Sequence, residues 1–185
     1  ASANIATTSC QAAATGSIDL TAVGGTLPFT YFWSGPGAFS SANEDLSALF
    51  AGGDNVTSTD ANGCTHTESF DVNEPDLFNI TATISSYAGG YNVSCAVSSD
   101  GSIDATVTGG TGPYFYFWSG PNSFTAITED LAGLNDGVYN LTLTDQNGCS
   151  ALATYSLVAP TPINIGLVAG LYNGGVNTTC ASTPD

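Results

Sequence analysis

Apolar and polar side chains alternate along most of this chain. Between residues 103 and 107 every second side chain is apolar, and Gly109 and Gly110 end the run. Residues 139–143 alternate in the same way, and residues 114–118 are aromatic throughout. A period of two residues places alternate side chains on one face of a β-strand. The pattern therefore predicts short strands that each turn one face toward a core.

Turn residues divide these runs at short intervals. Asn147 and Gly148 form the strongest hairpin signal in the chain, and the alternating run 151–157 predicts the return strand. Residues 129–134 are too few for a stable helix and predict a helical turn. Many short strands, with turns roughly every 8–12 residues, are typical of an all-β sandwich. We therefore expect an all-β fold of the immunoglobulin-like type.

The whole pattern recurs after 85 residues. Cys10, Cys95 and Cys180 are separated by that interval. A fixed period of this kind is the signature of tandem repeats. We predict sandwich repeats over residues 1–75 and 76–160, and the start of a third repeat over residues 161–185. The blocks that recur in register are residues 16–19 with 101–104, 31–36 with 116–121, 44–46 with 129–131, and 62–64 with 147–149.

Five cysteines stand at fixed places in this period. The interval from Cys10 to Cys64 equals that from Cys95 to Cys149, so each unit holds one pair. We predict the disulfides Cys10–Cys64 and Cys95–Cys149, with Cys180 as the first half of a further pair. A bridge from Cys64 to Cys95, between units, is the alternative. Zinc binding is the competing interpretation, but no CxxC pair or histidine cluster supports it. Disulfides imply an oxidising, extracellular setting.

Three aromatic residues are the expected centres of the two cores. Trp33 and Trp118 occupy the same place in the aromatic strands of the two units. Tyr139 precedes a late strand in the pattern of a tyrosine corner, whose hydroxyl bonds back to the chain upstream. The first unit departs from this pattern, because Asp54 stands where the second has Tyr139. An aspartate cannot take the role of that tyrosine.

The charge of the chain excludes several classes of partner. It holds 16 acidic residues and neither lysine nor arginine, which gives a net charge of −16 at pH 7. Neutralising the phosphates of a nucleic acid needs cations, so we expect no nucleic-acid partner. Anionic membrane surfaces are excluded for the same reason. The sequence also lacks an apolar stretch long enough to cross a membrane.

Catalysis is not expected from these residues. His66 is the sole histidine, its counterpart in the second unit is Ala151, and the usual general bases and oxyanion stabilisers are scarce. The acidic pairs 44–45 and 129–130 precede a leucine and are better suited to capping a turn than to glycoside hydrolysis. We expect no cofactor. The abundant oxygen ligands suit weak calcium binding, although no particular residues are assigned to it.

Both units resemble the SprB repeat of Bacteroidetes cell-surface proteins. The resemblance covers nearly the whole chain, and the combination of motifs in register is specific. It departs at Asp54 and at Thr15, where the family usually has aspartate. In the second unit the resemblance is carried by residues 100–104, 109–114, 118–119, 129–131, 137–139, 144–145 and 147–149, and in the first by 16–19, 24–25, 33–34, 44–46 and 60–64.

The resemblance implies a very long, secreted, surface-anchored adhesin with many such units. In that family, export by the type IX secretion system and gliding motility are known. We expect this segment to be an extended spacer. Its expected partners are neighbouring repeats of the same chain, an extracellular polysaccharide or surface, and secretion and motility machinery elsewhere in the chain. The alternatives are a carbohydrate-binding module that uses the aromatic strand 29–33, and a subunit of a strand-exchanged polymer. Both alternatives stay open at this point.

Overall fold

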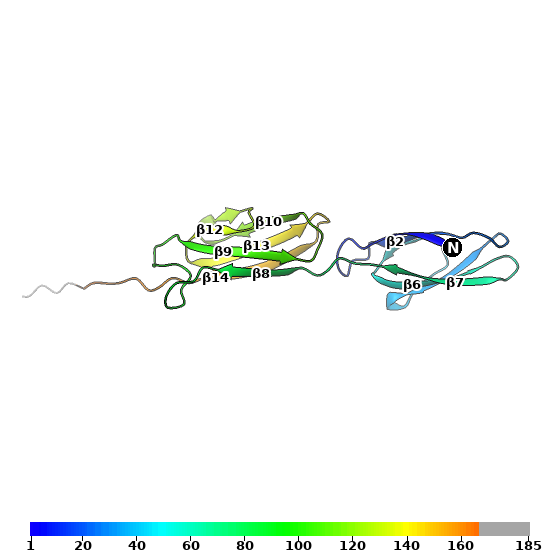
Figure 1. The fold of residues 1–185 in the computed structure, drawn as a ribbon, viewed down its shortest axis with the longest axis horizontal. Coiled ribbons are helices and arrows are strands. Elements are labelled where there is room, and N and C mark those ends of the chain that lie inside the picture. The colour runs from blue at the N-terminus through cyan, green and yellow to red at the C-terminus, as the bar shows by residue number, and fades with distance from the viewer. Residues whose placement is uncertain (167–185) are drawn as a thin grey trace, which may run out of the picture.

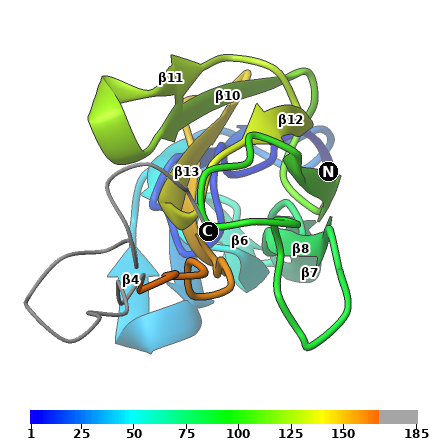
Figure 2. The ribbon, with the colours of Figure 1, turned by 90° about the vertical axis from the view of Figure 1, so that its left-hand side faces the viewer.

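The computed structural model describes residues 1–166 and contains two β-sandwiches. The sandwiches lie end to end along the long axis of the molecule (Figure 1). Seen along that axis, the second unit lies in front of the first (Figure 2). Most of the predicted third repeat, residues 167–185, lies outside the described residues. The two sandwiches therefore form an elongated molecule.

The second sandwich consists of two antiparallel sheets. One holds three strands in the order β12-β9-β8, and the other holds four in the order β11-β10-β13-β14. The strands are β8 (Asn79–Ile84), β9 (Gly101–Thr108), β10 (Tyr114–Ser119), β11 (Thr125–Ala126), β12 (Leu131–Leu134), β13 (Gly137–Asp145) and β14 (Ser150–Leu157), with a short 3-10 helix η2 (Pro121–Ser123) after β10.

The first sandwich repeats this arrangement. Its sheets have the orders β1-β2-β5 and β4-β3-β6-β7, which match those of the second unit strand for strand. The strands are β1 (Ser2–Ala6), β2 (Gly16–Thr21), β3 (Thr30–Gly35), β4 (Phe39–Ser41), β5 (Leu46–Leu49), β6 (Gly52–Thr59) and β7 (Thr65–Val72), with the 3-10 helix η1 (Pro36–Ala38) after β3.

Alternating strands supply both cores, which confirms the prediction of an all-β, immunoglobulin-like sandwich. Tyr139, Leu141 and Leu143 of β13 point inward at every second position. Trp33 and Trp118 have no exposed surface. The indole Nε1 of Trp118 donates to the carbonyl oxygen of Thr128 at 3.0 Å, and that of Trp33 bonds a carbonyl in the same way. The buried donors are thereby satisfied, as such groups must be.

The helical turn predicted over residues 129–134 is wrong. Leu131 and Leu134 belong to the strand β12, and both are buried. The pairing with β9 shifts between Ala132 and Leu134, where Gly133 has a φ of 69°. This irregularity puts two leucines three residues apart on one face, a spacing that resembles a helix in the sequence. The carboxylate of Asp130 accepts from the backbone N–H of Ala105 at 3.0 Å, so it serves the sheet.

Tyr139 makes the contacts of a tyrosine corner. Its hydroxyl donates to the carbonyl oxygen of Asn135 at 3.1 Å. Its ring meets that of Phe124 edge to face, with centroids 5.4 Å apart. A Cβ at Gly120 would lie 2.7 Å from the ring of Tyr139, so the glycine leaves room for the aromatic side chain. The corner thus needs the tyrosine, the phenylalanine and the glycine together.

The first unit has the same glycine and phenylalanine around this position but lacks the tyrosine. Asp54 is fully buried at the corresponding position, and neither carboxylate oxygen has a hydrogen-bond partner. Gly35 and Phe39 stand where the second unit has its glycine and phenylalanine. A cleft of about 230 Å³ lies at this position, and its lining includes Phe39, Phe50 and Asp54. Burial raises the pKa of Asp54, because the charged form loses its hydration.

This shift predicts a pH-dependent penalty at Asp54. The unfolded chain loses the proton near a pKa of about 3.9, whereas the folded chain holds it to higher pH. Stability from this group therefore falls as pH rises between the two values, and the loss is complete above the folded pKa. We expect Asp54→Asn to stabilise the first unit at neutral pH and to have a smaller effect at about pH 3. Urea unfolding, followed by Trp33 fluorescence in a Trp118→Phe background, measures this difference. A difference that does not change with pH contradicts the assignment.

Candidate functional site at the junction of the two units

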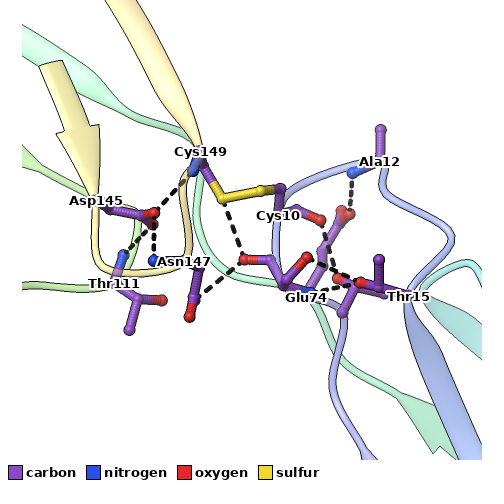
Figure 3. Close-up of a disulfide and its surroundings, with 10 residues drawn as sticks. Cys10, Ala12, Thr15, Glu74, Thr111, Asp145, Asn147 and Cys149 are labelled. Atoms are coloured by element: carbon purple, nitrogen blue, oxygen red, sulfur yellow. Dashed lines mark hydrogen bonds between the residues drawn. A yellow bond between two sulfur atoms is a disulfide. The ribbon is translucent and has the colours of Figure 1, made fainter.

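A disulfide joins the two sandwiches. It links Cys10, in the loop between β1 and β2, to Cys149, at the turn between β13 and β14, across a sequence separation of 139 residues (Figure 3). This pairing corrects the predicted bridges Cys10–Cys64 and Cys95–Cys149. Cys64 and Cys95 are free and exposed, so the alternative bridge between them is also absent from residues 1–166. The covalent link lies between units and not within them.

The length of the strands explains the correction. Cys10 precedes β2, whereas Cys64 follows β6, and the pairing of β3 with β6 places that turn beyond the far end of β2. Six extended residues in β2 separate these ends by about 20 Å. A disulfide needs its two Cα atoms within about 7 Å of each other. The two cysteines of one unit therefore lie at opposite ends of the sandwich and cannot meet.

Asp145 shapes the turn that presents Cys149. Its Oδ1 accepts from the backbone N–H groups of Asn147 and Cys149, both at 2.9 Å. Its Oδ2 accepts from the N–H of Thr111 at 3.0 Å, and its side chain is buried. One carboxylate thus satisfies three donors and ties the turn to the neighbouring loop. The turn is fixed from within the second unit, independently of the bridge.

Asn147 adds a polar contact beside the disulfide. Its Nδ2 donates to the carbonyl oxygen of Ser9 at 3.2 Å. The Sγ of Cys149 lies 3.2 Å from the same oxygen. Because a disulfide sulfur carries no hydrogen, this second approach is a close contact without a donor. The segment 9–10 of the first unit therefore rests directly on the turn of the second (Figure 3).

The linker between the units runs from the end of β7 at Val72 to the start of β8 at Asn79. Its first half is hydrogen-bonded to the first sandwich. The backbone N–H of Thr8 donates to the carbonyl oxygen of Asn73 at 2.9 Å. The N–H of Ala12 donates to Oε2 of Glu74 at 2.8 Å. Both bonds join the linker to the loop that carries Cys10, and the bond between Ala12 and Glu74 is drawn in Figure 3. The loop and the start of the linker are thus held as one structure.

The other half of the linker is bound to the second sandwich. The N–H of Gly110 donates to the carbonyl oxygen of Asp76 at 2.8 Å. A Cβ at Gly109 would collide with the carbonyl of Leu77, and one at Gly110 with the ring of Phe78. Both glycines have positive φ, at 79° and 64°. Their lack of a side chain allows the linker to lie against the loop.

The sequence did not identify Ser9, Glu74 or Asn147 as junction residues. A signal for the bridge was present, because the interval from Cys10 to Cys149 is the predicted 54-residue spacing plus one 85-residue period. In a periodic sequence, a cysteine pairing between one unit and the next recurs at the same interval as a cysteine pairing within a unit. Periodicity alone therefore could not distinguish the two.

The other candidate groups lie apart from the junction. His66 is on the surface, with Nε2 3.6 Å from Oε2 of Glu68. Within residues 1–166, no three histidine, cysteine or acidic residues gather as a group that could hold a metal ion. Calcium binding stays a prediction. In the same residues no helix is long and apolar enough to span a membrane.

Comparison with known proteins finds a matching family and several distantly similar structures, of which two are described below. The SprB repeat matches residues 2–38 and 91–123, which are corresponding parts of the two units. No curated protein matches the chain. The amphioxus IgVJ-C2 molecule is 12% identical, with a TM-score of 0.39 over 80% of this chain and 98% of its own. A C-terminal fragment of intimin, in complex with an intimin-binding domain, is 14% identical with a TM-score of 0.41; the match covers 85% of this chain and 64% of that fragment.

Proposed function

Because the chain belongs to the SprB-repeat family, we propose that it is a structural repeat segment of a long cell-surface adhesin. In this role it acts as an extended spacer that holds a binding region away from the cell. The observation that carries the proposal is the disulfide Cys10–Cys149, which joins one repeat to the next. A bridge in this place adds nothing to either core, whereas it directly restrains the angle between repeats.

The junction has two covalent connections in parallel. One is the linker, which is hydrogen-bonded to both sandwiches through Asn73, Glu74 and Asp76. The other is the bridge between Cys10 and Cys149. Bending at a single flexible linker is the default expectation for neighbouring domains. Here a bend must deform both connections, so the pair of units resists bending.

Charge and redox chemistry support the same role. A net charge of −16 without lysine or arginine makes neighbouring molecules repel and opposes bundling. Disulfides persist in oxidising compartments outside the cytoplasm, which supports a surface location. Export by the type IX system and a part in gliding rest on the resemblance to the family. We propose no catalytic activity for this segment.

Small-angle scattering of the full chain tests the spacer. We expect a narrow, rod-like profile for the oxidised protein. Cys10→Ser together with Cys149→Ser leaves only the linker and should shorten the mean end-to-end distance by about a tenth. Cys64→Ser is the matched control, because it removes a cysteine outside the junction, and it should leave the profile unchanged. Identical profiles for the double variant and the parent protein would refute a stiffening role for the bridge.

A carbohydrate-binding module is the second candidate. On the outer face of the sheet that holds β10 and β14, Phe115, Phe117 and Leu152 are 60%, 52% and 78% exposed. Exposed aromatic rings of this kind are suited to contact with apolar faces of ligands. An array of polysaccharides probed with the full chain separates the candidates. The spacer proposal expects no binding, whereas binding that Phe117→Ala abolishes would reassign the function to this face.

A further inference from the structure

We propose that Cys64 and Cys95 are the two unused halves of further junctions, each of which receives another repeat unit of this kind. Cys64 accepts the loop of a unit that carries a cysteine in the place of Cys10. Cys95 accepts the turn of a unit that carries one in the place of Cys149. Successive bridges then link a whole array from unit to unit. This inference rests on the geometry of the junction and does not depend on a role in adhesion.

The turn that holds Cys64 already has the shape of the turn that holds Cys149. Oδ1 of Asp60 accepts from the N–H groups of Asn62 and Cys64, both at 2.9 Å, and Oδ2 accepts from the N–H of Thr26 at 3.1 Å. These are the bonds of Asp145, shifted by one period. The backbone N–H donors lower the pKa of Asp60. The turn is therefore built before any partner is bound.

A hollow beside this turn corresponds to an occupied place at the observed junction. It measures about 370 Å³, and its lining includes Gly24, Gly25, Asp60 and Cys64. The counterparts of the two glycines are Gly109 and Gly110, against which the linker lies through Leu77 and Phe78 at the junction. The corresponding cleft there, of about 240 Å³, is lined by Cys10 and the linker itself. The glycine pair beside Cys64 therefore offers the loop and linker of another unit the same surface that Gly109 and Gly110 offer at the observed junction.

Asn62 makes a different side-chain hydrogen bond from its counterpart Asn147. Its Nδ2 donates to Oγ1 of Thr26 at 2.9 Å, within its own unit. At the junction the corresponding Nδ2 of Asn147 donates to the carbonyl oxygen of Ser9 in the other unit. A rotation of the side chain exchanges one acceptor for the other. Asn62 is therefore the residue whose contribution to docking is separable from folding.

The loop that holds Cys95 matches the loop that holds Cys10. The N–H of Ser94 donates to Oδ1 of Asp100 at 3.0 Å, as that of Ser9 donates to Oγ1 of Thr15 at 2.7 Å. The N–H of Ser98 donates to the carbonyl oxygen of Cys95 at 3.0 Å, a bond that also recurs in the first unit. This loop joins β8 to β9 and lies at the outer end of the second sandwich (Figure 1). Among residues 1–166, the two free thiols therefore stand at the two ends of the pair of units.

The chemistry of each new bridge is thiol–disulfide exchange. The thiolate of Cys95 attacks a small disulfide oxidant, such as oxidised glutathione, and forms a mixed disulfide while one small thiol leaves. The thiolate of Cys64 from another copy then attacks the sulfur of Cys95, and the second small thiol leaves. Two protein thiols lose two protons and two electrons, and the oxidant takes up both. No metal or further reactant is needed.

Oxidation of a mixture of two variants tests the pairing. One variant carries Cys64→Ser with Cys180→Ser, so that Cys95 is its one free thiol; the other carries Cys95→Ser with Cys180→Ser, so that Cys64 is free. Both keep the bridge Cys10–Cys149. We mix them in equal amounts in a glutathione redox buffer and separate the products under non-reducing conditions. Docking predicts that the Cys64–Cys95 heterodimer exceeds each homodimer by roughly tenfold or more, because docking raises the effective concentration of one thiol at the other.

Asn62→Ala in the variant with the free Cys64 should lower that excess several-fold, while Asn55→Ala, on an exposed strand position of the same unit, should leave it unchanged. Peptide mapping should identify Cys64 joined to Cys95. A statistical mixture of heterodimer and homodimers would show that the thiols pair without docking and would overturn the proposal. Failure to form the heterodimer at all would overturn it equally.

Discussion

Replacing Asp54 with tyrosine is expected to stabilise the first unit by about 3 kcal/mol. The change removes a buried carboxylate whose two oxygens have no partner. It also fills the cleft of about 230 Å³ that lies over this position. The second unit shows that Gly120 and Phe124 accommodate such a ring, and Gly35 and Phe39 repeat them in the first. Urea unfolding, followed by Trp33 fluorescence in a Trp118→Phe background, measures the gain.

Asp54→Asn separates the two contributions in this comparison. The asparagine removes the charge but leaves the cleft open, so its gain at neutral pH should be smaller than that of the tyrosine. If the tyrosine is no better than the asparagine, the ring does not enter the cleft. If Asp54→Tyr destabilises the first unit, the seat is not equivalent to that of Tyr139. Trp118 fluorescence in a Trp33→Phe background should show no change in the second unit.

Asp145→Ala is expected to destabilise the second unit by about 3 kcal/mol. The substitution leaves the N–H groups of Thr111, Asn147 and Cys149 without their acceptor, and the site is buried. The three donors are part-buried, and each hydrogen bond that is lost costs about 1 kcal/mol. The measurement is urea unfolding followed by Trp118 fluorescence in a Trp33→Phe background. The same turn carries Cys149, so reduction of the bridge by dithiothreitol should also become faster.

Asp60→Ala is the matched control for this prediction. It removes the same three bonds in the first unit, where the turn carries the free Cys64. The control should destabilise the first unit and leave the reduction rate of Cys10–Cys149 unchanged. A loss below about 1 kcal/mol for Asp145→Ala would mean that the turn does not depend on its carboxylate. Equal effects of both variants on the reduction rate would contradict the local role of Asp145.

Strand positions could be predicted from the sequence because burial in a sandwich follows a period of two. The aromatic positions of β10 and the leucine positions of β13 are the plainest examples. In β10 exposed side chains alternate with half-buried or buried ones, and in β13 each buried side chain is separated from the next by an exposed or half-buried one. The residues of β12 resemble a helical turn in the sequence, because the irregularity at Gly133 replaces the period of two with an interval of three. Local backbone irregularities of this kind have no distinct hydrophobic pattern.

The junction was harder to predict for a different reason. The sequence shows that Cys10, Cys64, Cys95 and Cys149 are regularly placed, but regular placement is the same for bridges within and between units. The choice depends on which end of a sandwich each cysteine occupies, and this follows from strand pairing. The departure at Asp54 was visible in the sequence. Its buried, unpartnered state could be found only once the packing around it was known.

The position of the bridge has a consequence for damage to the backbone. Cys10 and Cys149 enclose most of both units, including the linker between them. A single cut by a protease at any peptide bond between these cysteines leaves the two fragments covalently attached. Two bridges confined to separate units would protect only the segments that they enclose, and one cut in the linker would release everything beyond it. The observed connection therefore allows the pair of units to remain in one piece after a cut until the disulfide is also reduced.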